Sequence, residues 1–173
     1  MVENKMFETV NGLLEKYIGG QIFFTELDKA VKFNDEILDS LIIKASTKFP
    51  KAKTIASGEI GLAMHNLGVK IDLLVAGGLR FNPEKINLEP FADRIRNQEF
   101  IFVDDSYFSG KTAMVVKEEI ERLGGKWLGC YVAYDGSKSK EKDVYALYRY
   151  YDYHDILGRK LEKNTWQTTL NVL

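Results

Sequence analysis

The sequence has little cysteine and histidine, and each shortage excludes a class of protein. The 173 residues include one cysteine, Cys130, and two histidines, His65 and His154. A single cysteine cannot form an internal disulfide, and its apolar surroundings favour a buried, inert thiol. With no cysteine near either histidine, a zinc site has almost no ligands to draw on. The composition disfavours a disulfide scaffold and a zinc protein, and we expect a reducing, cytoplasmic compartment.

Long hydrophobic runs and an excess of positive charge are also missing. No apolar stretch approaches the roughly 18 residues of a membrane span. The N-terminus MVENKMFETV lacks the positive-then-apolar order of a signal peptide. The formal net charge is −1, whereas proteins that neutralise nucleic-acid phosphates carry Lys and Arg in clear excess. We therefore expect a protein that binds neither a membrane nor a long nucleic acid.

Enough apolar residues are present to form the core of one domain spanning residues 1–173. The apolar content is 45% and the charged content 28%, within the range of a single compact domain. Helical spacing predicts two helices within residues 1–50. The first contains Met6, Val10, Leu13, Leu14 and Tyr17; the second contains Ile37, Leu38, Leu41, Ile42, Ala45 and Phe49, with Asn34 and Asp35 as N-cap candidates and Pro50 closing it.

From residue 51 to about residue 135, short apolar runs alternate with helical stretches. Strands are expected at Lys53–Ser57, Ile71–Ala76, Phe100–Val103 and Trp127–Ala133. The helices between them carry Ile60, Ala63, Met64 and Leu67 on one face of the first, and Ala113, Val116, Ile120 and Leu123 on one face of the second. This alternation predicts an α/β, Rossmann-like fold with a mostly parallel central sheet flanked by helices.

Two stretches do not fit this alternation. Residues 77–98 join two expected strands with weak periodicity and one short helix from Pro90 to Gln98, and connections of this length are often lids or mobile loops. Residues 136–173 form an aromatic segment whose tyrosines are Tyr145, Tyr148, Tyr150, Tyr151 and Tyr153. The pattern assigns no secondary structure to this segment.

The segment that carries chemistry is VDDSYFSGKT, residues 103–112. The apolar run before it predicts a buried strand ending at Asp104 and Asp105, so the carboxylates are expected at the C-terminal edge of the sheet, where α/β proteins bind ligands. The next residues lead into a helix, whose unpaired N–H groups and dipole suit a phosphate. Ser109, Gly110 and Thr112 can complete the cradle, leaving the carboxylates to accept hydrogen bonds from two adjacent sugar hydroxyls.

This segment resembles the ribose-phosphate signature of type I phosphoribosyltransferases. The resemblance implies that Asp104 and Asp105 hold the ribose 2′ and 3′ hydroxyls. It implies that the 5′-phosphate is wrapped by Ser106, Tyr107, Phe108, Ser109, Gly110, Lys111 and Thr112. The loop Ala56-Ser57-Gly58-Glu59 stands where the family has its pyrophosphate-binding turn. Ser57, Gly58 and Glu59 would therefore bind diphosphate through backbone N–H groups, with Arg80 as a catalytic cation from the following loop.

The same resemblance implies a reaction. The substrates would be 5-phosphoribosyl 1-diphosphate (PRPP) with magnesium, and a base whose nitrogen replaces diphosphate at C1 of the ribose. Mg²⁺ needs few protein oxygens when the substrate supplies phosphates, so no direct metal ligands are expected. Residues 77–98 stand where the family has a mobile loop, with Arg80 and Lys85 as its cations. Family members commonly form homodimers, and the resemblance implies one here.

Recognition of the base is expected in the aromatic segment or the N-terminal helices. The stretch YYDYHDIL is similar to the C-terminal stretch of purine-salvage members, and tyrosines at 145–153 could stack on a base while Asp152 or Asp155 binds its edge. Tyrosine clusters also serve as packing residues. Nothing in the sequence selects a purine over a pyrimidine.

Three alternatives stay open. Ser109-Gly110-Lys111-Thr112 ends like the P-loop GxxxxGK[ST] of a phosphotransferase, but the first glycine of that motif would be residue 105, which is aspartate. The two aspartates could form only a strand-to-helix turn with an N-cap. A non-catalytic regulatory or binding module could keep the site for PRPP or a nucleotide without the reaction, because one fold hosts both roles.

Overall fold

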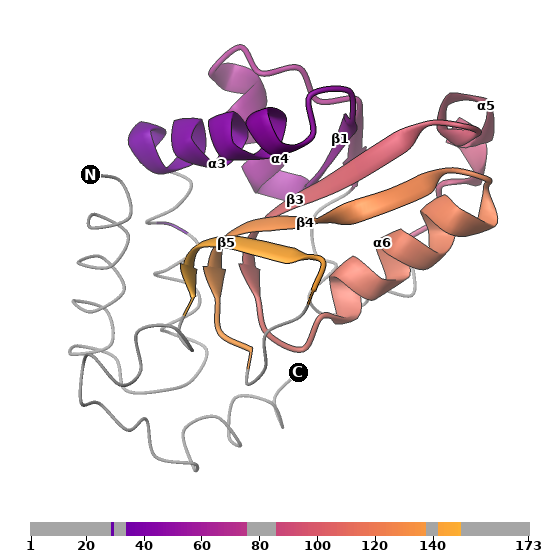
Figure 1. The fold of residues 1–173 in the computed structure, drawn as a ribbon. Coiled ribbons are helices and arrows are strands. Elements are labelled where there is room, and N and C mark those ends of the chain that lie inside the picture. The colour runs from indigo at the N-terminus through magenta and orange to yellow at the C-terminus, as the bar shows by residue number, and fades with distance from the viewer. Residues whose placement is uncertain (1–28, 30–33, 76–85, 138–141, 150–173) are drawn as a thin grey trace.

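The computed structural model describes residues 29, 34–75, 86–137 and 142–149 (Figure 1). Its elements are, in chain order, α3 (Asp35–Lys48), β1 (Lys53–Ser57), α4 (Gly58–Asn66), β2 (Leu73–Val75), η2 (Glu89–Phe91), α5 (Ala92–Ile95), β3 (Glu99–Tyr107), α6 (Lys111–Arg122), β4 (Lys126–Asp135) and β5 (Val144–Arg149). The helix expected around residues 6–17 lies outside the described residues.

The five strands form one sheet in the order β2-β1-β3-β4-β5, and every neighbouring pair is parallel. Helices α3 and α4 cover one face of the sheet, and α5 and α6 lie on the other (Figure 1). This arrangement confirms the Rossmann-like α/β fold expected from the sequence. Among the described residues, none of the helices combines the length and the apolar character needed to cross a membrane.

Several local predictions are confirmed. Strand β1 has the expected bounds, and α3 begins after Asn34, whose side-chain oxygen accepts a hydrogen bond from the N–H of Ile37 at 3.3 Å. Helix α6 carries the apolar face expected from Ala113, Val116 and Ile120, which are buried, and ends at Arg122. The short helix expected at 90–98 is present as η2 and α5.

The expected end of the third strand was wrong. Strand β3 continues past Val103 to Tyr107, because the backbone of the polar residues keeps pairing with β4, as in the pairs Asp104↔Val132 and Tyr107↔Asp135. Polar side chains do not end a ladder, since the hydrogen bonds come from the main chain. The two aspartates therefore lie inside β3.

Strand β5 lies within the aromatic segment that the sequence pattern left unassigned. The ring of Tyr145 stacks on Tyr131 with centroids 5.4 Å apart, and Tyr148 stacks on Tyr134 at 5.5 Å. Tyr148 is fully buried, so its ring serves packing and is not open to a base. Tyr150, Tyr151, Tyr153, Asp152 and Asp155 lie outside the described residues.

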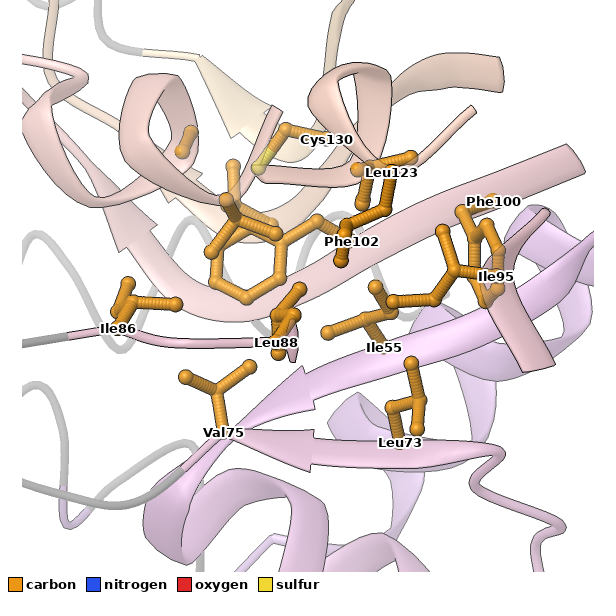
Figure 2. Close-up of a cluster of buried hydrophobic side chains, with 14 of the residues drawn as sticks. Ile55, Leu73, Val75, Ile86, Leu88, Ile95, Phe100, Phe102, Leu123 and Cys130 are labelled. Atoms are coloured by element: carbon orange, nitrogen blue, oxygen red, sulfur yellow. The ribbon is translucent and has the colours of Figure 1, made fainter. Parts of the chain in front are cut away.

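Among the described residues, the core has one apolar cluster on each face of the sheet. Figure 2 shows the cluster on the α6 side, where Phe100 and Phe102 of β3 lie among Ile55, Leu88 and Leu123. Cys130 belongs to this cluster, and burial raises the pKa of its thiol well above the usual value. The structure therefore confirms that Cys130 is buried. Its raised pKa keeps the thiol protonated.

The described end of the 77–98 connection is anchored to α6. The N–H of Leu88 donates to the carboxylate of Glu119 at 3.1 Å, and Arg122 forms ion pairs with Glu119 at 2.9 Å and with Glu89 at 2.7 Å. The Arg122 guanidinium lowers the pKa of the Glu119 carboxyl. Residues 86–98 thus pack on the fold, whereas Arg80 and Lys85, expected as loop cations, lie outside the described residues.

Candidate functional site

The two predicted carboxylates lie level with the C-terminal end of β1. The register pairs Val103 with Ala56, the residue before the last one of β1. Asp105 is 8% exposed and Asp104 is half-buried. Phe102 packs in the cluster on the α6 side and Tyr107 packs against the same cluster, so the strict side-chain alternation of β3 does not continue through Asp104 and Asp105.

Asp104 is held by two hydrogen bonds to the same oxygen. Its Oδ1 accepts from the backbone N–H of Asp105 at 2.9 Å and from the hydroxyl of Ser57. On the other carboxylate, Oδ1 of Asp105 accepts from the hydroxyl of Ser106 at 3.2 Å. The hydrogen bond from Ser57 thus joins β1 to Asp104 of β3, which lies 47 positions later in the sequence.

Ser57 is the N-cap of helix α4, but its side chain makes no capping hydrogen bond. The hydroxyl turns to Asp104 instead. The structure therefore brings together the two turns that the sequence singled out, Ala56–Glu59 and Val103–Thr112. Gly58 and the backbone of Glu59 form the first residues of α4, where the N–H groups of a helix have no intrahelical partner.

The loop between β3 and α6 turns on Gly110. Its φ of 72° lies in the left-handed region, which favours glycine, and a Cβ at this position would overlap the side-chain hydroxyl of Tyr107. Ser109 before it is exposed. The backbone conformation thus favours the glycine expected in the phosphate cradle, and a Cβ there would also require the Tyr107 side chain to shift.

Helix α6 starts without the features that usually satisfy a helix N-terminus. Its N-cap Gly110 has no side chain to accept a hydrogen bond, and no acidic residue lies in its first turn. The first residue is the exposed Lys111, followed by the half-buried Thr112. Unpaired N–H groups, the positive end of the helix dipole and a lysine together suit an anion such as phosphate.

The sequence reasoning missed an ion pair at the end of β4 and β5. Asp135 is fully buried and lies 3.1 Å from the guanidinium of Arg149, and its other oxygen accepts from the hydroxyl of Ser137 at 2.6 Å and its N–H at 2.9 Å. The next residue, Gly136, donates its N–H to the carbonyl of Tyr107 at 2.9 Å. The only sequence signal was an aspartate ending a buried apolar run, and its partner in β5 was not assigned to a strand.

Phe108 packs its ring against Tyr134, with centroids 5.4 Å apart. This aromatic contact and the Gly136–Tyr107 hydrogen bond tie the loop after β3 to the end of β4. The loop that is expected to wrap a phosphate is therefore supported from the neighbouring strand.

No protein-family model and no curated protein matches the sequence. Several solved structures have a similar arrangement. They include the adenine phosphoribosyltransferase of Rhodothermus marinus (16% identity, 66% of this chain and 78% of that chain, TM-score 0.44). A hypoxanthine phosphoribosyltransferase of Staphylococcus aureus is 11% identical, covers 70% of this chain and 74% of that chain, and has a TM-score of 0.47. A purine phosphoribosyltransferase of Pyrococcus horikoshii is 20% identical, covers 66% of this chain and 81% of that chain, and has a TM-score of 0.47. Sequence identities this low between the two chains bear on the fold alone. The case for a function therefore depends on this chain's own residues.

Proposed function

We propose that this protein is a phosphoribosyltransferase that transfers phosphoribose from PRPP to a nitrogen of a nucleobase or related acceptor, releasing diphosphate. The observation that carries the proposal is the hydrogen bond between Ser57 and Asp104, which joins the two motif segments at one edge of a parallel sheet. Farther along the same motif segment, α6 begins after a left-handed glycine and has no acid in its first turn. A ribose carrying phosphates at both ends needs these parts close together.

Each part has a role in binding. Carboxylate oxygens of Asp104 and Asp105 accept hydrogen bonds from the ribose hydroxyls. The N–H groups and hydroxyls of residues 106–112 bind the 5′-phosphate at the start of α6. The N–H groups of Ser57, Gly58 and Glu59 at the start of α4 receive the diphosphate, which gains negative charge as the bond to C1 breaks, so donors placed there lower the barrier.

Magnesium fits this site as a companion of the substrate. Among residues 34–75, 86–137 and 142–149, no three His, Cys, Asp or Glu side chains are grouped so as to hold a metal ion. Mg²⁺ usually keeps several waters and is held largely by substrate phosphates, so it would arrive with the diphosphate and need few ligands from the protein. Bound with the diphosphate, the ion would neutralise part of its charge.

The test is diphosphate release from magnesium PRPP across a panel of purine and pyrimidine bases. The wild-type protein should release diphosphate with at least one base, and Asp104→Asn/Asp105→Asn should abolish the release, because amides cannot supply two charged acceptors to the ribose. A matched control is Asp39→Asn/Asp93→Asn, which removes two exposed carboxylates on α3 and α5.

The control variant should keep the wild-type rate. Release that persists in the Asp104→Asn/Asp105→Asn variant would refute the assigned site. No release with any base, while PRPP still binds, would favour the non-catalytic binding module over the enzyme.

A further inference from the structure

The contact between Ser57 and Asp104 has a consequence for how the two ends of the ligand are bound. Ser57 contributes two different groups. Its backbone is both the last residue of β1 and the N-cap of α4, and its hydroxyl donates to Oδ1 of Asp104. A single residue therefore belongs to both the diphosphate side and the ribose side of the proposed site.

The hydrogen bonds fix the direction of the Asp104 carboxylate. Oδ1 accepts two donors, the Ser57 hydroxyl and the Asp105 N–H at 2.9 Å, which come from different strands. Rotation of a planar carboxylate about its terminal bond is restricted when one oxygen is held from two directions, so the position of Oδ2 is restricted as well. Pre-set acceptors save the ordering cost that a ligand would otherwise incur on binding.

The oxygen of the Ser57 hydroxyl accepts no capping hydrogen bond. A serine at a helix N-cap commonly accepts a hydrogen bond from the second or third N–H of the helix, and that bond typically contributes about 1 kcal/mol to stability. Ser57 is the N-cap of α4 and makes no such bond. The hydroxyl therefore donates to Asp104 and does not cap the N–H groups at the start of α4.

We infer that the Ser57 side chain is a positioning residue that orients Asp104 toward the ribose, while its backbone serves the diphosphate. This inference rests on the proposed function, because it assigns Asp104 to the sugar. It separates two roles at one residue. Removing the hydroxyl should weaken binding of the sugar end and leave binding of the diphosphate end unchanged.

The experiment is calorimetric titration of the full chain with two probes, ribose 5-phosphate and inorganic diphosphate, each with Mg²⁺. Ser57→Ala should weaken ribose 5-phosphate binding roughly tenfold, the scale of one hydrogen bond to a charged group. Diphosphate binding should stay unchanged, because the backbone N–H is kept. Ser57→Thr keeps the hydroxyl and should restore most of the loss, and Ser46→Ala, an exposed serine of α3, should change neither affinity.

A double-mutant cycle completes the test. In an Asp104→Ala background, Ser57→Ala should cause no further loss of ribose 5-phosphate affinity, because its partner is already gone. Equal ribose 5-phosphate binding by wild type and Ser57→Ala would overturn the inference and leave the proposed function standing. A parallel loss for both probes would mean a general structural defect and would also overturn it. Failure of the wild-type protein to bind ribose 5-phosphate at all would overturn the proposed function together with the inference.

Discussion

Helices α3 and α6 begin in opposite ways. At the start of α3, Asn34 caps the N–H of Ile37, and Asp35 and Glu36 place negative charge in the first turn. At the start of α6, the cap is Gly110, the first turn holds no acid and Lys111 adds positive charge. Both helices present the same four N–H groups and the same positive dipole end.

The difference shows how a chain separates a structural terminus from a binding terminus. A helix that supplies its own cap and its own acids satisfies its N-terminus and has little left for a ligand. A helix without them gives up that stability and keeps its donors for an anion from outside. The contrast predicts that substitutions at α6 act mainly on ligand binding and that substitutions at α3 act mainly on folding.

The largest effect is expected for Gly110→Ala. The left-handed φ costs alanine about 1–2 kcal/mol, and the new Cβ overlaps the Tyr107 hydroxyl, so we expect a total loss of about 2–4 kcal/mol of unfolding free energy. The displaced loop should also lose ribose 5-phosphate binding. Chemical denaturation and calorimetric titration measure the two effects.

A matched control is Gly68→Ala. Gly68 has a similar φ of 80°, but no atom lies within 4 Å of where its Cβ would be. It should therefore show only the conformational cost, about 1–2 kcal/mol, with unchanged ligand affinity. Equal losses for the two variants would show that the contact with Tyr107 has no energetic weight.

A smaller effect is expected for Lys111→Glu. Placing an acid in the first turn of α6 imitates α3 and should weaken ribose 5-phosphate binding by roughly tenfold at low salt, with a smaller loss at high salt because the site is exposed. Helix stability should rise by a few tenths of a kcal/mol for the same reason. Titration at two ionic strengths checks the affinity.

The mirror-image variant is Asp35→Lys, which gives the first turn of α3 a positive charge. It should lower stability by about 0.5 kcal/mol without creating an affinity for ribose 5-phosphate, because the rest of the binding loop is missing there. If Asp35→Lys gave α3 a ribose 5-phosphate affinity as large as the one lost from α6 in Lys111→Glu, the charge of the first turn alone would be enough to make the site.

The sequence contained the information for these helix termini, because caps and first turns are local. Asn34 before an amphipathic run, and a glycine before Lys111, are visible without the fold. The contacts that the sequence could not show join distant residues. Ser57 meets Asp104 across 47 positions, and a serine after a strand predicts a cap more readily than a bond to another strand.

Strand ends were difficult for the same physical reason. The pattern of side chains indicated that β3 stops at Val103, whereas pairing with β4 continues to Tyr107 because main-chain groups make the ladder. In β5 the tyrosines follow no simple alternation, since Tyr145 and Tyr148 pack on tyrosines of β4. The burial of Asp135 against Arg149 follows from that pairing and could not be predicted before it.

The smallest effect on ligand binding is expected at the start of α3. Asn34→Ala removes the acceptor for the N–H of Ile37 and should lower the unfolding free energy by about 1 kcal/mol, measured by urea denaturation. Asn34→Asp keeps an acceptor and should retain most of the stability. Ribose 5-phosphate affinity should be the same in both variants and in the wild type, because α3 satisfies its own N-terminus. A loss of affinity in Asn34→Ala beyond its loss of stability would mean that the two termini are coupled, and the division between a folding terminus and a binding terminus would fail.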